Sequence, residues 1–593
     1  MDGKKYIEVI LPLKLEWNPV YYISGEENVS AGDRVKVRFA GREYVGTVSA
    51  VDIRPEVALE KISPVTSVQT GLPPVSAQEM EFWKFISEYY LCSIGEVYKA
   101  AYPSLKIRSE VSSVNASQRS EQSRARMTAS IEKRIAKLKD RLEKKEAALE
   151  GRHSEAVKSR LEAERGKVAS ELEAARAALE KFIAGESSPS SCGKPARISS
   201  LRKTSSPALK PTVLTSPDRR NTYINMAREA LAAGQNVLVL VPENDFASNM
   251  EGLFRNAFPG RLTVFSSRLS AAQRRKISDM LRMDVNPGII LGTRSSLFLP
   301  FRNLGLVIVD EEQDPLHKQT EPAPRINARD CAAVLAKIHG ASLALGSSSP
   351  SLETALNCLS GKYAASRGAP LSKAEIIDVA AERRKNGMIG PYSLKLKKII
   401  DSTEGRVVIV RGWENAEELS GWTNDLFGSR DVETLTPQAA RKLALRPALM
   451  AILQADAIFA KDDFRADEKA LQLMRQLSEK ADRLVVQTAK SAHPVFRALE
   501  DGLDTAVLLE ERKDFSLPPY TKMVDILIED GSESRKELMT RRLCRALGTG
   551  SLRIVFPRDT RLAENKARLY RDILAFEKQN NYFSHIRLDV DPL

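Results

Sequence analysis

The sequence predicts a multidomain α/β protein with a β-rich N-terminal domain, a coiled-coil hairpin, two parallel α/β lobes and a C-terminal α+β module. Its 593 residues suffice for several domains of roughly 100 to 200 residues each. Short apolar runs alternate with helical stretches, which is typical of strands buried on both faces of a parallel sheet. Residues 118–185 differ from the rest, because they are rich in Ala, Glu, Lys and Arg and contain no Pro.

Residues 1–107 are predicted to form the β-rich domain. Val35 and Val37 alternate with charged residues, which is the period of two of a half-buried strand. Gly41 supplies a turn after this strand. From Ser76 to Tyr98 the pattern becomes helical, with large aromatic side chains on one side, so we expect a helix to follow the sheet.

Residues 108–185 are predicted to form an antiparallel coiled-coil arm, because apolar residues recur there at heptad spacing. Gly151-Arg152-His153 interrupts the repeat and separates two helices of roughly 30 residues, each about 45 Å long. Two interpretations stay open: the arm contacts a partner, or it only spaces two domains. Residues 186–215, rich in Ser, Pro and basic side chains, are predicted to be a linker able to contact phosphate.

Two α/β units follow, at 216–365 and 366–510, before a final α+β module at 511–593. Four short apolar runs predict buried strands in the first unit, and a fifth run opens the second. These runs are Val237–Val241, Gly288–Leu291, Leu304–Val309, Leu343–Leu345 and Arg406–Val410.

The charge balance restricts the class of partner. Lys and Arg number 90 against 77 Asp and Glu, which gives a net charge of +13 and favours nucleic acid or an anionic membrane surface. No apolar run reaches the roughly 18 residues that span a bilayer, and the N-terminus has no secretory signal. The five cysteines form no C-x-x-C pair, which argues against disulfides or thiolate zinc. We therefore expect a cytoplasmic protein with no membrane segment and no metal.

The most informative stretch is Asp310-Glu311-Glu312-Gln313-Asp314, directly after the apolar run 304–309. A buried strand that delivers two carboxylates at its C-terminal end is the Walker B arrangement, in which one carboxylate orients Mg²⁺ and the next activates water. Asp310 and Glu311 are therefore the candidate catalytic residues. The motif alone is weak, because acidic residues often simply end a strand.

Further motifs in a fixed order strengthen this interpretation. They are Gly292–Phe298, Pro324-Arg325, Ala328–Asp330 and Gly346–Glu353 near the carboxylates, with Leu11–Leu13, Gly32–Val37, Tyr89–Cys92, Asp463–Ala466, Pro518–Tyr520 and Asp589–Pro592 in the flanking regions. Together they resemble the PriA family of primosomal replication-restart proteins, which are superfamily-2 DNA helicases. The resemblance implies RecA-like lobes, a 3′-DNA-end-binding domain, and ATP with Mg²⁺ as cofactors. It also implies DNA forks, 3′ ends, and primosome or single-strand-binding proteins as partners.

The sequence departs from this family around the nucleotide. The family's phosphate loop ends in G-K-T, whereas Thr215–Tyr223 contains no glycine and offers Arg219 as its candidate nucleotide-binding residue. Because glycine amides and the lysine hold the phosphates, we expect Asp310 and Glu311 to be vestigial. Leu477–Arg483 replaces the arginine-bearing G-R-A-G-R element, the eight-cysteine zinc insertion is missing after Trp413, and the second lobe is truncated between Ala455 and Asp463.

The candidate DNA-binding residues lie in the N-terminal domain. The family's Phe-Asp pair falls at Pro19-Val20, so base stacking is expected from Tyr21 or Tyr22. The resemblance assigns Gly41 and Lys61 to the same pocket. Arg34, Lys36, Arg38 and Arg42 alternate with apolar residues and are predicted to form one basic face. A solvated strand surface is the alternative interpretation of that face.

These observations predict a DNA-binding replication-restart protein for primosome assembly, which recognises branched or 3′-ended DNA and has little ATPase or unwinding activity. The alternative is an active ATP-dependent 3′→5′ helicase, in which Arg219 holds phosphate while Asp310 and Glu311 bind Mg²⁺ and activate water. A second alternative is a non-enzymatic scaffold that works through its coiled-coil arm.

Overall fold

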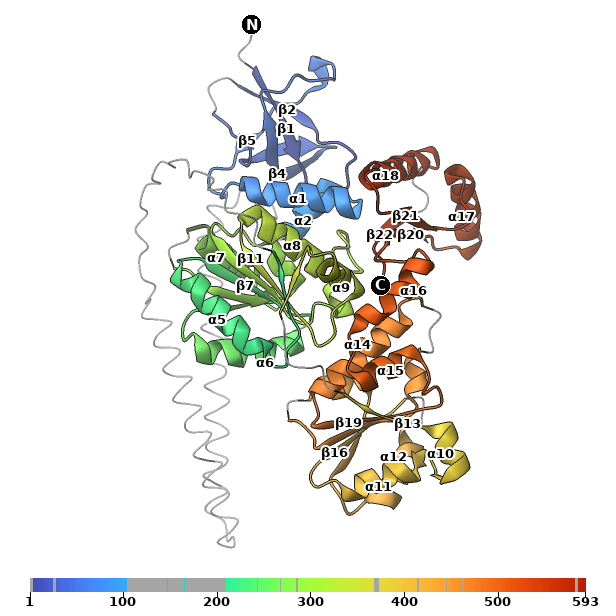
Figure 1. Ribbon diagram of the computed structural model, residues 1–593. Helices are drawn as coiled ribbons and strands as arrows, with labels where there is room; N and C mark the ends of the chain where they lie inside the picture. Colours follow the sequence, from blue (N-terminus) through green and yellow to red (C-terminus); the bar gives the residue numbers. More distant parts are fainter. Residues whose placement is uncertain are drawn as a thin grey trace. The chain divides into compact units, whose positions relative to one another are not determined.

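The computed structural model (Figure 1) describes residues 4–24, 28–103, 210–242, 244–266, 268–283, 286–366, 373–412, 415–443, 445–459, 463–581 and 585–593, with the single positions 147 and 165. The predicted coiled-coil arm and most of the predicted linker lie outside these residues. The chain divides into two compact units, Met1–Leu105 with Ser206–Leu593, and Lys106–Ser205. The sheets and helices of the described residues belong to the first unit. Among the described residues, no helix is both long and apolar enough to cross a bilayer.

The N-terminal domain is an antiparallel sheet of order β2-β1-β4-β3-β5 followed by two helices. The β3–β4 turn is tight because Ala40 and Gly41 both have positive φ, 46° and 77°. Each helix begins at a capping box formed by a serine and the glutamate three residues later. The bounds are β1 Lys4–Ile10, β2 Val20–Ser24, β3 Arg34–Phe39, β4 Arg42–Val51, β5 Ser67–Val68, α1 Ala77–Tyr90 and α2 Ile94–Ala101.

The first lobe is a parallel sheet of order β12-β6-β11-β10-β7-β9-β8. Apolar side chains of α5 and α6 cover one face, and those of α7 and α8 cover the other. The strands are β6 Thr212–Leu214, β7 Asn236–Leu240, β8 Leu262–Phe265, β9 Ile289–Gly292, β10 Leu304–Val309, β11 Ser342–Gly346 and β12 Ala364–Ala365. The helices are α5 Arg219–Ala232, α6 Asn244–Ala257, α7 Ala271–Met283, α8 Ala328–His339 and α9 Leu352–Leu359.

The four apolar runs predicted as strands in this lobe coincide with β7, β9, β10 and β11. One boundary differs from the prediction. β6 pairs with β11 and β12, although Thr212–Leu214 falls inside the range predicted to be linker. Three residues between prolines and polar residues are too short to show a period, so this strand is defined by its neighbours in the sheet.

The second lobe is also a parallel sheet, of order β13-β19-β18-β16-β17. The run predicted to open it is β16, and β13 precedes it in the sequence. The strands are β13 Glu375–Asp378, β16 Val407–Val410, β17 Val432–Leu435, β18 Leu449–Ile452 and β19 Arg483–Thr488, with a small hairpin of β14 Met388–Ile389 and β15 Tyr392–Ser393. The helices are α10 Val379–Lys385, α11 Leu394–Ser402, α12 Ala416–Phe427, α13 Pro437–Arg441, α14 Ala466–Glu479, α15 Pro494–Asp501 and α16 Leu509–Asp514.

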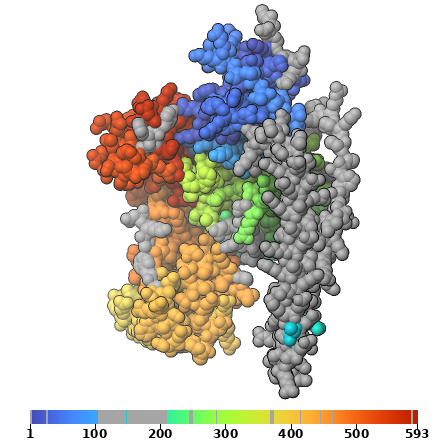
Figure 2. Space-filling model, turned by 180° about the vertical axis from the view of Figure 1, so that it is seen from behind, coloured from blue at the N-terminus to red at the C-terminus, as the bar shows by residue number. Residues whose placement is uncertain are grey.

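The C-terminal module is an antiparallel sheet of order β21-β20-β22 with two helices, shown in red in the space-filling view of Figure 2. Its elements are β20 Thr521–Glu529, α17 Glu533–Leu547, β21 Arg553–Pro557, α18 Leu562–Gln579 and β22 His585–Val590. Helix α1 of the N-terminal domain packs against both α8 of the first lobe and β22 of this module. One continuous apolar cluster therefore links the three parts.

Candidate functional site

The C-terminal end of β10 carries the candidate catalytic carboxylates. β10 is buried along its whole length, and Asp310 and Glu311 follow it directly. The positive φ of Glu311, 51°, ends the extended run. Because β6 and β10 are parallel strands of one sheet, helix α5 after β6 begins at the same edge as these carboxylates. In open α/β sheets this edge is where ligands bind.

Arg219 occupies that edge. It is the first residue of α5 and is 3% exposed. Its Nη2 lies 2.5 Å from Glu311 Oε1, its Nε 3.5 Å from Asp310 Oδ1 and its Nη1 3.0 Å from Glu479 Oε2. Glu479 is the last residue of α14, in the stretch that replaces the G-R-A-G-R element. The guanidinium thus joins carboxylates from both lobes, and we call these four residues the Arg219 cluster.

Polar side chains surround the cluster and donate hydrogen bonds to the carboxylates of Asp310 and Glu311. Tyr223 Oη donates to Asp310 Oδ1 at 2.9 Å. The side-chain amides of Gln313 and Gln476 each donate to Glu311 Oε2 at 2.8 Å. Gln476 belongs to α14, so this bond also crosses between the lobes. Both oxygens of Glu311 are therefore engaged by protein groups.

Burial and charge act against each other in the Arg219 cluster. Burial disfavours the charged guanidinium, but Glu311, Asp310 and Glu479 outweigh it and raise the pKa of Arg219 well above its usual value. Burial alone would raise the pKa of Glu311, yet Arg219, Gln313 and Gln476 bring it below its ordinary value. For Glu479 burial prevails over Arg219, and its pKa is raised. Arg219 and Glu311 form the charged centre of a buried ion cluster.

The residues at this edge do not fit a magnesium nucleotide. Mg²⁺ needs oxygen ligands with open coordination positions, whereas the oxygens of Glu311 are held by Arg219 and two amides. Pro217 has no N–H to offer a phosphate, and Asp218 adds negative charge before the helix. Arg219 stands at the sequence position that the resemblance gives to the phosphate-binding lysine. Arg219 therefore acts as an internal cation, and we derive no catalytic step at Asp310 or Glu311.

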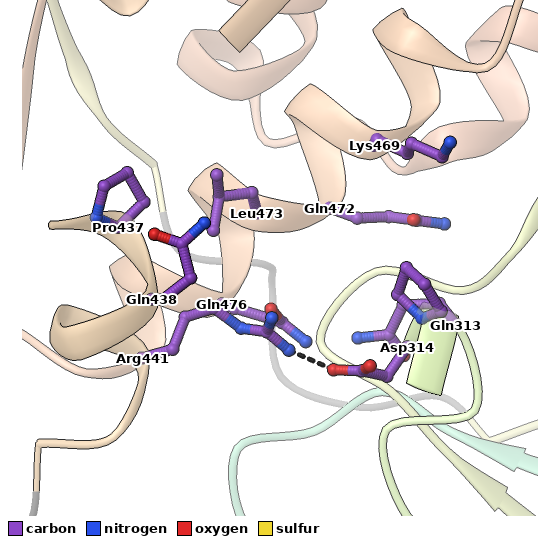
Figure 3. Close-up of a pocket in the computed structure, with 10 residues that line it drawn as sticks. Gln313, Asp314, Pro437, Gln438, Arg441, Lys469, Gln472, Leu473 and Gln476 are labelled. Carbon is purple, nitrogen blue, oxygen red and sulfur yellow. Dashed lines mark hydrogen bonds and ion pairs between the residues drawn. The ribbon is translucent and has the colours of Figure 1, made fainter. Parts of the chain in front are cut away.

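The next acidic residues of the motif are also held by protein groups. Glu312 accepts the N–H of Ser351 at 2.7 Å and the hydroxyl of Thr354 at 3.1 Å. Asp314 forms an ion pair with Arg441 of α13 (Figure 3). That pair lines a cavity of about 150 Å³, with further donors from Gln438, Lys469 and Gln472. Each carboxylate after β10 thus has a structural partner.

Two of the predicted DNA contacts lie inside the N-terminal domain. Tyr21 is 3% exposed and donates to a backbone carbonyl of β3. Arg34 is equally buried, with Nη1 at 2.7 Å from Thr47 Oγ1 and 2.9 Å from Tyr98 Oη. Its guanidinium also lies 4.1 Å from the ring centroid of Tyr102. Arg34 and Tyr21 therefore stabilise the domain, and this corrects the expectation that they face DNA.

The other candidates stay at the surface but do not share one face. Gly41, Arg42 and Lys61 are exposed, and Tyr22 and Lys36 are half-buried. Arg42 pairs with Phe39 across the hairpin, whereas Arg38 pairs with Glu43, so Arg42 and Arg38 project from opposite faces. Lys36 Nζ lies 3.0 Å from Glu43 Oε2, which neutralises its charge. The prediction of a single basic face is wrong.

Comparisons with known proteins agree with the order of motifs. Residues 8–103 match the family model of the PriA 3′ DNA-binding domain. Replication restart protein PriA of Rickettsia felis is 23% identical over 509 residues, which covers 65% of this chain and 78% of that protein. The chain is similar to PriA proteins. PriA of Chlamydia pneumoniae is 36% identical over 205 residues, 33% of this chain. That alignment spans only 27% of the chlamydial protein's length.

A solved structure of RecG bound to a three-way DNA junction covers 62% of this PriA-like chain and 47% of RecG, at 14% identity and a TM-score of 0.32. This score is too low to bear on the fold. The parallel sheets of the two lobes stand instead on their own strand pairing.

Sequence reasoning missed several residues of this PriA-like protein. Glu479 completes the Arg219 cluster, and Tyr223 and Gln476 donate hydrogen bonds to it, yet only the loss of the expected arginine element pointed to the region of Glu479. The sequence held one usable signal: Arg219 and Glu479 carry opposite charges and lie in the two stretches that depart from the expected phosphate-binding motifs. Trp17 was also overlooked; it is 60% exposed and meets Phe39 edge to face at 6.4 Å.

Proposed function

We propose that this PriA-like protein recognises branched or 3′-ended DNA during replication restart without hydrolysing ATP efficiently. The buried guanidinium of Arg219, bound to Asp310, Glu311 and Glu479, is the observation that carries the proposal. The three carboxylates are already paired with Arg219 and are not free to bind a metal. Moving them to a metal would leave the buried guanidinium unpaired in the interior, which is costly. We propose that the protein works in the cytoplasm.

DNA binding is supported by the match to the 3′ DNA-binding domain and by the net charge of +13. Within that domain Arg42 and Lys61 are exposed, and we propose that they contact phosphate. Tyr22 and Trp17 offer partly or largely exposed rings for base stacking, and Gly41 lies exposed in the β3–β4 turn. Primosome and single-strand-binding proteins are proposed as partners by resemblance to PriA.

ATP turnover tests the catalytic half of the proposal. Purified protein and its Glu311→Gln variant are assayed for ATP hydrolysis with and without forked DNA. We expect no turnover above that of the variant, because Glu311 is engaged by Arg219 and two amides. DNA-stimulated hydrolysis that the substitution abolishes would instead establish the helicase alternative, which rests on the retention of Asp310 and Glu311 at the end of β10.

The salt dependence of DNA binding tests the other half. Anisotropy with a 3′-ended fork is measured for Arg42→Ala and Lys61→Ala across a salt series. Because each phosphate contact contributes to counterion release, each variant is expected to reduce the slope of log K against log salt by about 1. Arg228→Ala is the matched control, since Arg228 is an exposed arginine of α5. A slope that falls equally in the control would refute these contacts, and absence of binding would favour the scaffold alternative.

A further inference from the structure

Helix α14 of the second lobe presents a row of polar side chains to the first lobe. At its C-terminal end Glu479 contacts Arg219 at 3.0 Å, and Gln476 contacts Glu311 at 2.8 Å. The last turn of α14 therefore contacts the first lobe at the sheet edge that holds Asp310 and Glu311. The ion pair between Arg441 of α13 and Asp314 adds a further contact from the second lobe to the same loop (Figure 3).

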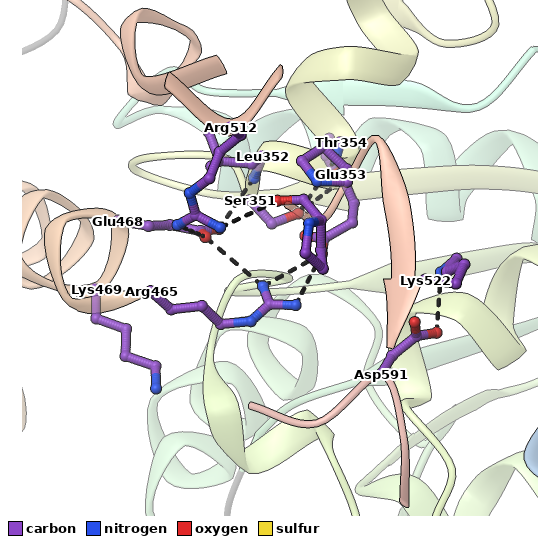
Figure 4. Close-up of polar contacts among 12 residues, drawn as sticks. Ser351, Leu352, Glu353, Thr354, Arg465, Glu468, Lys469, Arg512, Lys522 and Asp591 are labelled. Carbon is purple, nitrogen blue, oxygen red and sulfur yellow. Dashed lines mark hydrogen bonds and ion pairs between the residues drawn. The ribbon is translucent and has the colours of Figure 1, made fainter. Parts of the chain in front are cut away.

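The N-terminal end of α14 makes a second set of contacts with the first lobe (Figure 4). Glu468 accepts the N–H of Leu352 at 3.0 Å and lies 3.3 Å from a guanidinium nitrogen of Arg512. Arg465, which immediately precedes the helix, lies 3.2 Å from Glu353 of α9. These four side chains are nearly buried, with the carboxylate of Glu353 the most exposed at 18%. Helix α14 is therefore fixed to the first lobe at both ends.

Apolar packing continues between these two sets of contacts. Leu352 and Ala355 of α9 belong to the core cluster of the second lobe, where Leu352 is fully buried beside residues such as Leu471, Met474 and Phe496. The hydroxyl of Thr505 also donates to the carbonyl of Pro350. Separating the lobes would expose this apolar surface and would break the pairing of the buried charges. Both effects disfavour separation of the two lobes.

We propose that the two lobes form one permanently closed body, in which Arg219 is the built-in counterion that holds the closed state without nucleotide. Asp310 and Glu311 from one lobe and Glu479 from the other would repel one another at this distance. The single guanidinium between them converts that repulsion into attraction across the lobes. Closure is then a fixed property of the fold, whereas an ATP-driven motor has to alternate between open and closed states.

Hydrogen exchange of the full-length protein tests this closure, without nucleotide or DNA. Glu479→Gln and Gln476→Ala change only the bonds that the C-terminal end of α14 makes to the first lobe, because Arg219 keeps Asp310 and Glu311. We expect amides in the last turn of α14 and in residues 310–314 to exchange at least about tenfold faster. Arg219→Ala is expected to have a larger effect, since it leaves three buried carboxylates uncompensated.

Arg220→Ala is the matched control, because it removes an arginine charge one residue along α5 and outside the cluster. Calorimetry on the same proteins supplies a second readout: one cooperative transition in the native chain is expected to separate into two in Arg219→Ala. Native exchange in both Glu479→Gln and Gln476→Ala would overturn the proposal, even if Arg219→Ala fails to fold. The result does not depend on DNA binding, so the failure of one proposal is distinguishable from the failure of the other.

Discussion

Tyr223 occupies space that Gly346 leaves open beside the Arg219 cluster. A Cβ on Gly346 would lie 1.4 Å from Tyr223 Oη and 3.2 Å from Arg219 Cδ. Burial, followed by the neighbouring Asp310 charge, raises the pKa of Tyr223 well above its usual value, so the hydroxyl keeps its proton and donates a hydrogen bond to Asp310. The absence of a side chain at position 346 thus decides whether the tyrosine reaches the carboxylate.

Gly346→Ala is therefore expected to destabilise the protein by about 1–3 kcal/mol, the usual cost of overpacking a filled core. Urea unfolding measures the change. Tyr223→Phe removes the clashing oxygen, so the double variant is expected to lose less stability than the sum of the two single variants. Gly252→Ala is the control: nothing lies within 4 Å of its Cβ position on α6, and it should stabilise by about 0.5–1 kcal/mol. Additive single and double variants would contradict the clash.

At the scale of elements, α1 is the helix on which the N-terminal domain and the C-terminal module meet. Tyr89 Oη donates to Asp591 at 2.7 Å, and Lys566 of α18 donates to the carbonyl of Tyr89 at 2.5 Å. The ammonium of Lys566 lies 3.9 Å from the centroid of the Tyr89 ring. Burial lowers the pKa of Lys566 to about 8, although Asp591 acts in the opposite direction. Keeping Lys566 charged at this junction therefore lowers the free energy of unfolding.

This junction predicts a pH dependence. Between about pH 8 and the pKa of an exposed lysine near 10.4, the unfolded chain binds more protons at Lys566 than the folded chain. The contribution of Lys566 to the free energy of unfolding therefore increases as the pH rises through that window. In Lys566→Met the free energy of unfolding is expected to rise less across this pH window. The increase should be smaller than that of the native protein by on the order of 1–3 kcal/mol. Denaturant unfolding from pH 7 to 10 checks this, with the exposed Lys578→Met as control; parallel curves for native protein and Lys566→Met would contradict it.

At the scale of the whole molecule, the two lobes share buried ions and an apolar core. The closure proposed above leaves no open state that a nucleotide would close. A ligand that binds only the folded protein at 100 times its Kd adds about 2.7 kcal/mol to stability. We expect no such gain from magnesium and ATP.

Thermal unfolding with increasing Mg-ATP is the measurement, and Tm is expected to stay constant. Forked DNA is the positive control, because a bound ligand has to raise Tm by mass action. A Tm that rises with Mg-ATP, and no longer does so in Glu311→Gln, would show that the Arg219 cluster opens to admit nucleotide.

The sequence was sufficient to predict the features that depend on local periodicity. The buried runs became β7, β9, β10, β11 and β16, because a strand buried on both faces is apolar throughout. The placement of Asp310 and Glu311 followed from the same pattern. β6 was missed because its three residues are too few to show a period.

Long-range placement could not be predicted in the same way. Arg34 lies on the polar face of its strand by period, but α2 covers that face and brings Tyr98 against it. Arg219 and Glu479 are 260 positions apart, and only the packing of α14 brings them together. The period of apolar residues shows which side of a strand or helix is polar. Whether that side is exposed to solvent depends on which element packs against it.

The Arg219 cluster also restricts how this protein can change by mutation. Lysine at position 219 alone would leave Glu479 close to Asp310 and Glu311 with a single shorter cation among them. Glycine at position 479 alone would break the contact to Arg219 without freeing the carboxylates. Each one-step reversal therefore passes through a less stable protein, and only coordinated substitutions in both lobes would rebuild a phosphate loop. In this fold a phosphate loop is therefore difficult to build by single substitutions.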